Sequence, residues 1–288
     1  MIVGPQAVLA PAKINLFLHV GPEGSDGYHP VCSLMAFADI GDLVRLEPAD
    51  ALSLRIEGPF AAALAGEDSG DNLVMRAARA LGAPATGIVL DKRLPVAAGL
   101  GGGSSDAGAA LRLLRQRHAR EVGDAALEEI AAGLGADGAA CLWGRAVLAE
   151  GRGEVLAPAP RLPSLAAVLV NPGVPCPTGA VYRAFDALPA GPGADRPALP
   201  KAFGTVEQAA SFLARCRNDL EPAAAGLVPE VAATLAALRA EPEPLLVRLS
   251  GSGATCFALC ADEAAAKRLA MRLQGEEPGW WVRSCRLG

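Results

Sequence analysis

The chain has 288 residues, of which 51% are hydrophobic and 4% aromatic, and its formal net charge is −5. This composition is typical of a folded protein and excludes a disordered chain. The negative charge disfavours a nucleic-acid partner, which requires a clustered basic surface, but it leaves a small phosphate ligand open. The length allows two domains.

The sequence has neither a membrane-spanning run of about 18 apolar residues nor the basic and apolar segments of a signal peptide at its start. We therefore expect a cytoplasmic protein with no membrane partner. The cysteines form no C-x-x-C pair and no cluster with metal-ligand spacing, so we expect reduced, mostly buried thiols. The seven positions are Cys32, Cys141, Cys176, Cys216, Cys256, Cys260 and Cys285.

The first half of the chain alternates between strand and helix patterns. Apolar, partly alternating segments predict strands over residues 7–19, 35–46, 52–56 and 87–90. An Asp71-Asn72 cap precedes a predicted helix over residues 73–81. Further helices are predicted from residue 107 to 121–123 and over residues 125–134, followed by an apolar segment over 139–143 and a hairpin over 147–156.

The second half repeats this mixture after Pro158, Pro160 and Pro163, which indicate a domain boundary. The predicted domains are residues 1–157 and 158–288. Strands are predicted over residues 165–171 and 280–285, with a strand–turn–strand over 248–260, and helices over 206–215, 229–240 and 263–273. Residues 189–200 form a Pro-, Gly- and Ala-rich surface loop, a composition that allows mobility but does not decide it. Strands and helices mixed in both halves predict an α+β fold in two layers.

A glycine-rich stretch provides the strongest functional signal. It runs Pro95-Val-Ala-Ala-Gly-Leu-Gly-Gly-Gly-Ser-Ser-Asp106 and leads into a predicted helix. Glycines allow close backbone approach to a ligand, and the first N–H groups of a helix have no partner within it. The stretch therefore predicts a phosphate site. It is neither a Walker A loop, because no Lys-Ser/Thr pair follows the glycines, nor a dinucleotide fingerprint.

Further segments combine with this loop into a family pattern. Pro11-Ala-Lys13-Ile-Asn15-Leu and Leu249-Ser-Gly-Ser-Gly-Ala-Thr255 lie on either side of it, and this order resembles the GHMP kinase superfamily. The first of these segments, together with Asp26-Gly-Tyr-His29, Asp71-Asn-Leu and Gly135-Ala-Asp137, resembles the narrower 4-diphosphocytidyl-2-C-methyl-D-erythritol kinase family. The resemblance extends over nearly the whole chain.

The resemblance implies a two-domain GHMP kinase architecture, with a ribosomal-S5-domain-2-like N-terminal part and a ferredoxin-like α+β C-terminal part. It also implies ATP-dependent phosphorylation of the 2-hydroxyl of the cytidine diphosphate sugar alcohol, a step of non-mevalonate isoprenoid biosynthesis. ATP and Mg²⁺ are the expected cofactors, with metal ligands left unassigned. The expected partner is that small-molecule substrate, and the expected state is a monomer or weak homodimer.

Lys13 and Asp137 match the catalytic residues of the resembled family. A tertiary alcohol is a poor nucleophile, so a carboxylate within hydrogen-bond reach is a sensible base, and an ammonium beside it can stabilise the developing alkoxide. Each residue also has a plainer interpretation. Asp137 could cap the turn after Gly135, and Lys13 could extend from an apolar strand to solvent. With the surrounding motifs, we expect a buried Lys13–Asp137 pair.

The predicted ATP site centres on the glycine loop, whose backbone N–H groups would bind the phosphates. Asn72 would lie near the adenine by resemblance, although its plainer role is a helix cap. Asp106 could favour the helix dipole or reach Mg²⁺, and we expect the structural role. The predicted cofactor-binding residues are Pro95, Gly99, Leu100, Gly101, Gly102, Gly103, Ser104, Ser105 and Asn72.

The predicted substrate site rests mainly on the resemblance. Tyr28 and His29 would bracket and hydrogen-bond the cytosine, and Tyr182 would stack on its other face. The second glycine turn would pack beside the phosphate loop, although alone it reads as a tight hairpin. His19 and His118 are expected to be structural or solvated. The predicted substrate-binding residues are Asn15, Tyr28, His29, Asp137, Thr178, Tyr182, Gly251, Ser252 and Gly253.

Three other functions compete with this interpretation. Another GHMP kinase, acting on mevalonate, homoserine or a sugar, would have no aromatic base for Tyr28, His29 and Tyr182 to recognise. An inactive nucleotide-binding regulator would not need both Lys13 and Asp137. An RNA-binding module is disfavoured by the net charge of −5 and by the absence of a basic aromatic stripe.

Overall fold

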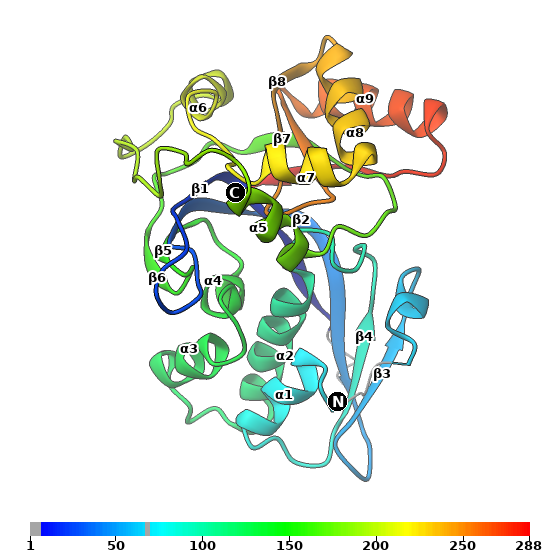
Figure 1. Ribbon diagram of the computed structural model, residues 1–288. Coiled ribbons are helices and arrows are strands. Elements are labelled where there is room, and N and C mark those ends of the chain that lie inside the picture. The colour runs from blue at the N-terminus through cyan, green and yellow to red at the C-terminus, as the bar shows by residue number, and fades with distance from the viewer. Residues whose placement is uncertain (1–6, 67–69) are drawn as a thin grey trace. The chain divides into compact units, whose positions relative to one another are not determined.

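The computed structural model describes residues 7–66 and 70–288, which divide into two compact units (Figure 1). Unit 1 contains the described residues up to Lys13, then Ile40–Val96 and Gly101–Gly144. Unit 2 contains Ile14–Asp39, Ala97–Leu100 and Arg145–Gly288. Residues 1–6, where we expect no targeting segment, lie outside the described part of the chain. The predicted mixture of strands and helices in an α+β fold is confirmed.

The described residues of unit 1 form a small sheet and four α-helices. The second half of β2 (Val31–Glu47) pairs antiparallel with β4 (Gly87–Asp91), which pairs parallel with β3 (Ser53–Glu57). A single 3₁₀ turn, η1 (Ala61–Leu64), follows β3. The α-helices are α1 (Leu73–Ala80), α2 (Gly102–His118), α3 (Asp124–Ala132) and α4 (Gly138–Trp143).

The core of unit 1 forms between its sheet and helices α1 and α2. Val44, Ile88 and Leu90 from the strands pack with Val74 from α1 and Leu114 from α2, all of them buried. Full burial of one such aliphatic side chain stabilises the fold by about 1.5–3 kcal/mol. The start of α1 follows from Asn72, whose side chain accepts the Val74 N–H at 2.9 Å and so satisfies one otherwise unpaired donor.

Unit 2 contains a larger, mainly antiparallel sheet. Its strands run β10 (Trp281–Leu287), β7 (Leu165–Asn171), β9 (Cys256–Cys260) and β8 (Pro244–Leu249), in that spatial order. At Leu287, β10 also pairs with Ala38 of β2. The first half of β2 pairs with β5 (Val147–Gly151), which forms the predicted hairpin with β6 (Val155–Pro158). Residues of β1 (Val8–Val20) belong to both units.

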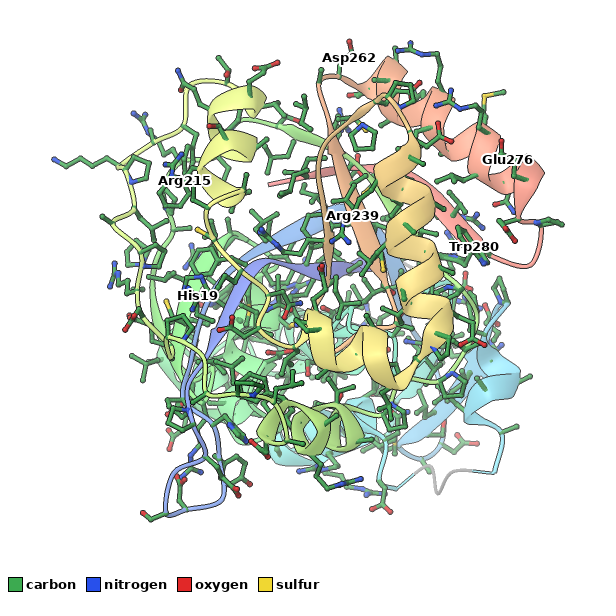
Figure 2. All side chains as sticks on the ribbon, turned by 45° about the horizontal axis from the view of Figure 1, so that its top comes forward. His19, Arg215, Arg239, Asp262, Glu276 and Trp280 are labelled. Atoms are coloured by element: carbon green, nitrogen blue, oxygen red, sulfur yellow. The ribbon has the colours of Figure 1, made fainter. Side chains whose placement is uncertain are left out.

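Five helices accompany this sheet. They are α5 (Thr178–Asp186), α6 (Val206–Leu213), α7 (Glu221–Leu227), α8 (Pro229–Ala240) and α9 (Glu263–Glu276). Asp262 precedes α9 and accepts the Ala265 N–H at 2.7 Å (Figure 2). Val231 and Leu235 from α8 and Leu269 from α9 share a buried aliphatic core with Val168 and Val170 of β7.

A search of the described residues for membrane-spanning helices finds no single helix long and apolar enough to cross a bilayer. The pair α7 and α8 passes the length and composition test only when taken together, and it is bent by 119°. The buried apolar residues of both helices, among them Ala224 and Leu238, belong to the core of unit 2.

Most predicted elements are present, with differences at their ends. The helix after the glycine loop ends at His118 rather than near residue 122, because Ala119 leaves the helical conformation. Three short helices, α4, α5 and α7, were not predicted as helices. Segments of the two units alternate along the chain. The predicted domain boundary between residues 157 and 158 stays a prediction.

Candidate active site

Lys13 and Asp137 form an ion pair within unit 1. The Lys13 Nζ lies 3.0 Å from Asp137 Oδ2, and 6% of the Lys13 side chain is exposed against 30% for Asp137. Lys13 projects from β1, while Asp137 directly precedes α4. The lysine therefore does not extend to solvent, and the expected ion pair is present, although only its lysine is buried. The partial exposure of Asp137 leaves its carboxylate open to a bound molecule.

The glycines at the start of α2 make room for this pair. Gly101 adopts a left-handed conformation with φ of 61° directly before the helix. A Cβ at this position would lie 3.0 Å from Lys13 Cε and 3.4 Å from Cys141 Sγ. Only glycine combines that backbone angle with that closeness. The first turn of α2, with the N–H groups that suit an anion, thus begins beside the Lys13 side chain.

A second buried lysine underlies the same helix. Lys92 Nζ lies 2.5 Å from Asp42 Oδ2 and 2.9 Å from Asp106 Oδ2. Although burial opposes it, the charges of Asp106 and Asp42 raise the pKa of Lys92. Burial raises the pKa of Asp106 to about 8. The Asp42 carboxylate adds to this increase, whereas Lys92 opposes it. Asp106 faces this lysine, which supports its expected structural role; no pattern in the sequence had singled out Asp42 or Lys92.

The preceding part of the glycine loop, Ala97–Leu100, belongs to unit 2 and contacts the second glycine turn there. Ser250 Oγ donates to the Gly99 carbonyl at 3.0 Å, and the Thr255 N–H donates to the Ala98 carbonyl at 3.1 Å. Gly99 has φ of 74°, and a Cβ there would lie 2.3 Å from the Ser250 carbonyl oxygen. The expectation that the two glycine motifs pack together is confirmed.

Asn15 lies in a polar contact of unit 2 with the same turn. Its N–H donates to Ser250 Oγ at 3.3 Å, and its side-chain amide donates to Ser33 Oγ at 2.8 Å. Ser33 in turn donates to the Phe17 carbonyl at 2.7 Å. A Cβ on Gly251 would lie 3.2 Å from Asn15 Oδ1. These contacts fix the orientation of Asn15, and Ser33 is a supporting residue that sequence reasoning missed.

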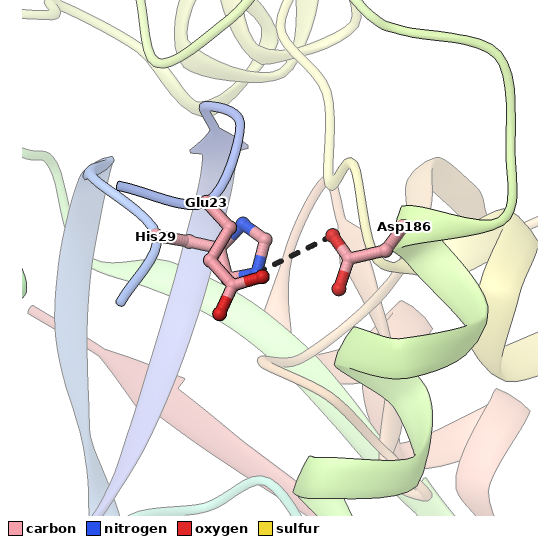
Figure 3. A group of neighbouring side chains, drawn as sticks. All are labelled: Glu23, His29 and Asp186. Atoms are coloured by element: carbon pink, nitrogen blue, oxygen red, sulfur yellow. Dashed lines mark ion pairs between the residues drawn. The ribbon is translucent and has the colours of Figure 1, made fainter. Parts of the chain in front are cut away.

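His29 and Tyr182, two of the residues predicted to bind the base, lie next to each other in unit 2. Their ring centroids lie 5.0 Å apart, and the Phe185 ring lies 5.8 Å from His29. Figure 3 shows the carboxylates of Asp186 and Glu23 beside the His29 imidazole. His29 Nε2 lies 3.4 Å from Asp186 Oδ1. One imidazole nitrogen and one oxygen from each carboxylate all lie within 4.8 Å of one another. Sequence reasoning missed both acids, because Glu23 lies in a turn and Asp186 at the end of an unpredicted helix.

The other predicted substrate residues of unit 2 are placed as follows. Tyr28 is 56% exposed, and the Arg152 guanidinium lies 4.3 Å from its ring centroid. The structure thus places Tyr28 against Arg152 and does not place it against His29 or Tyr182. Thr178, at the start of α5, shares a hydrogen bond of 2.8 Å with the hydroxyl of Ser252.

The remaining histidines have structural surroundings. His19 is buried, and its Nδ1–H donates to the Asp195 carbonyl at 2.7 Å, so Nε2 accepts the Arg217 N–H at 3.2 Å (Figure 2). Burial lowers the pKa of His19. His118 shares a hydrogen bond of 3.1 Å with Thr86. Arg217 also donates to the Gly193 carbonyl, so the loop over residues 189–200 is tied to unit 2 at two carbonyls.

Two family models match this chain. The model described as GHMP kinases N terminal domain matches residues 72–145, and the model described as GHMP kinases C terminal matches residues 197–277. A protein of Caulobacter vibrioides (strain NA1000 / CB15N) named 4-diphosphocytidyl-2-C-methyl-D-erythritol kinase is 58% identical, over 98% of this chain and 99% of its own length.

The chain belongs to the 4-diphosphocytidyl-2-C-methyl-D-erythritol kinase family.

A crystal structure of 4-(cytidine 5'-diphospho)-2C-methyl-D-erythritol kinase supports this family assignment. It matches with a TM-score of 0.77 and 36% identity over 98% of this chain and 99% of the other. A homoserine kinase from Cytophaga hutchinsonii matches with a TM-score of 0.71 but only 21% identity, which shows the fold alone. Members of the GHMP kinase family are small-molecule kinases that use ATP as the phosphate donor. The recognised resemblance and the expected GHMP kinase architecture are confirmed.

Proposed function

We propose that this kinase transfers the γ-phosphoryl group of ATP to the 2-hydroxyl of 4-diphosphocytidyl-2-C-methyl-D-erythritol. The observation that carries the proposal is the ion pair between buried Lys13 and partly exposed Asp137, at 3.0 Å, beside the start of α2. Relatives named for this activity, up to 58% identical over nearly the full chain, support the choice of acceptor. The proposal places the reaction in non-mevalonate isoprenoid biosynthesis.

Asp137 acts as the base in this proposal. Its carboxylate accepts the proton of the 2-hydroxyl as the oxygen attacks the γ-phosphorus, and the bond to the β-phosphate oxygen breaks. The Lys13 ammonium, which already contacts Asp137, stabilises the negative charge on the attacking oxygen. Such a buried lysine is well suited to the task, because its position changes little when the substrate binds.

The ATP phosphates bind at the glycine loop. A side chain on Gly101 would fill the space next to Lys13, so the loop fits a ligand that needs close backbone approach. Mg²⁺ would neutralise phosphate charge, and it needs only one or two protein oxygens besides the phosphates. The Ser104 hydroxyl is the candidate after the loop, because Ser105 is fully buried and Asp106 is engaged by Lys92. Asn72, whose side chain already caps α1, remains the candidate near the adenine.

The cytosine binds at His29 and Tyr182. Aromatic side chains suit a base with a π-face, and the carboxylates of Asp186 and Glu23 suit its exocyclic amino group, which donates hydrogen bonds. Asn15, Thr178 and the glycine turn with Ser252 are the further substrate contacts that we propose. Tyr28 would have to leave Arg152 to stack on the base. The monomeric or weakly dimeric state, the cytoplasmic location and the lack of nucleic-acid or membrane partners stay predictions.

The decisive experiment is an assay coupled to ADP release with Mg-ATP. The cytidine diphosphate sugar alcohol is run beside mevalonate and homoserine, with ATP alone as the blank. We expect turnover with the cytidyl compound only. Turnover with another alcohol would keep the Lys13–Asp137 chemistry but overturn the proposed cytosine site, and no turnover with any of them would favour a nucleotide-binding regulator.

A further inference from the structure

Three ionisable side chains meet in the interior of unit 1, outside the Lys13–Asp137 pair. Lys92 is 3% exposed, Asp106 is 2% exposed and Asp42 is fully buried. They come from three places in the chain: Asp42 from β2, Lys92 from the residue after β4, and Asp106 from the first turns of α2. Burying ionisable groups is costly unless each is paired, and Lys92 donates to both carboxyl groups.

Asp42 joins the group to the segment that leads into the glycine loop. One of its oxygens accepts from Lys92 Nζ at 2.5 Å. The other accepts the N–H groups of Arg93 at 2.5 Å and of Leu94 at 2.8 Å. Leu94 directly precedes Pro95, the first residue of the loop motif. The carboxylate thus fixes three successive residues at the entrance to the loop.

Lys92 joins the same group to the beginning of α2. Its Nζ donates to Asp106 Oδ2 at 2.9 Å. A Cβ on Gly102 would lie 3.3 Å from Lys92 Nζ and 3.7 Å from Asp42 Oδ2. Gly102 and Asp106 are four residues apart and therefore share one face of the helix. The ammonium lies against the first turn of α2, the turn whose N–H groups are proposed to bind phosphate.

The group therefore contacts both sides of the glycine loop within unit 1. Asp42 binds the segment that precedes the loop, and Lys92 and Asp106 meet at the first turns of α2, which follow it. We infer that Lys92 is a positioning residue that, held by Asp42 and Asp106, sets the first turn of α2 at the angle that ATP phosphates require. This inference rests on the proposed function. Such geometry matters because a displacement of about 1 Å at a phosphoryl-transfer site can lower the rate about a hundredfold.

The test replaces Lys92 by methionine, which has a similar length and no charge, and measures ATP affinity by calorimetry and steady-state kinetics. Lys92→Met is expected to raise KM and Kd for ATP about tenfold, while KM for the cytidyl substrate and Kd for adenosine change by less than about twofold. The matched control is Arg93→Met, the neighbouring cation, whose side chain is about half exposed and pairs with Asp91. It should leave all four constants unchanged.

A second variant, Lys92→Met/Asp106→Asn, removes the ammonium together with a carboxyl group that accepts from it, and guards against unfolding of the single variant. Circular dichroism must show it folded, and the same loss of ATP affinity is expected. A folded variant with wild-type ATP constants would overturn the inference, and so would an equal loss for adenosine. Unfolding of both variants would also overturn it, because the group would then serve folding alone. Failure of the proposed function is distinct, since wild-type protein would itself fail to phosphorylate the cytidyl substrate.

Discussion

At the scale of single residues, the two side chains of the Lys13–Asp137 pair differ in their exposure to solvent. Lys13 is enclosed, whereas Asp137 retains 30% exposure of its side chain. A cation that is already held in position has little rotamer freedom left to lose when substrate binds. The exposed partner is the one that must meet an incoming hydroxyl. The unequal burial therefore matches the unequal roles that we propose for the two residues.

Asp137→Asn tests the proposed base directly. The amide keeps the size of the side chain but cannot accept the proton, so turnover should fall about a hundredfold or more, while KM for ATP changes less than about threefold. Steady-state assays with the cytidyl substrate measure both constants. Near-wild-type turnover would remove Asp137 from this role.

The thiols lead to a second prediction at this scale. All seven cysteines are buried and free, and burial raises the pKa of every one, for Cys32 and Cys260 to about 11 and for Cys141 to about 12. Because the thiolate is the reactive form, titration of the native protein with a thiol reagent at about pH 8 should label fewer than about one thiol per chain. Denatured protein should show all seven. Rapid native labelling would contradict the described burial.

At the scale of elements, the close packing of two helices in unit 1 depends on a missing side chain. Gly108 lies within α2 where α4 approaches it, and a Cβ there would lie 2.8 Å from the Cys141 carbonyl oxygen and 2.9 Å from Leu142 Cα. Both atoms belong to backbone, which cannot rotate away. The distance between the helices, and with it the position of Asp137 before α4, follows from this glycine.

Gly108→Ala should destabilise the protein by about 1–3 kcal/mol, because the added methyl overpacks the helix contact. Gly275→Ala is the matched control: it is also a helical glycine, in α9, and a Cβ there would meet nothing within 4 Å. That change should stabilise by about 0.5–1 kcal/mol, since alanine favours helix. Chemical denaturation of both variants measures the two effects. A stabilising Gly108→Ala would show that α4 can move away.

The sequence was sufficient for elements with strong patterns and insufficient for those without them. The strand over residues 165–171 and the helix over 229–240 agree with the structure to the residue, since uninterrupted apolar or periodic segments end at clear breaks. Helix α5 was missed because its Gly and two β-branched residues are poor helix formers. Packing against the core of unit 2 through Val181 compensates for that low propensity.

The residues of the candidate site also differ in whether a local sequence pattern can reveal them. Lys13, Asp137 and the glycine loop lie in short motifs, so pattern and resemblance pointed to them. Asp42 and Lys92 are 50 residues apart, and each alone looks like an ordinary surface charge. Only the pairing of β2 with β4 brings them together, and no local pattern reports such a contact.

At the scale of the whole molecule, buried charge should make stability depend on pH. The pKa of Asp106 is raised to about 8 in the fold, so between its ordinary value of about 4 and that value the folded chain binds more protons than the unfolded chain. The contribution of this group to stability is therefore fully present below about pH 4 and is lost as the pH rises towards about 8.

Asp106→Asn isolates this effect, because an amide resembles the protonated acid at every pH. The difference in unfolding free energy, wild type minus variant, should fall steadily from about pH 5 to about pH 9. Urea denaturation across that range measures it, and titrating groups that do not contact Asp106 cancel in the difference. A difference that does not change with pH would mean that Asp106 is already ionised throughout.

The alternation of the two units along the chain has a consequence for how the protein is made. Every segment of unit 1 has been synthesised once Gly144 is reached, but the sheet of unit 2 needs β10, which pairs through Leu287 with Ala38. At ribosomal speeds, β2 remains without β10, its last partner strand, for on the order of ten seconds. An unpaired strand edge invites association with other chains. Early residues of this kinase are therefore a natural target for chaperones during translation.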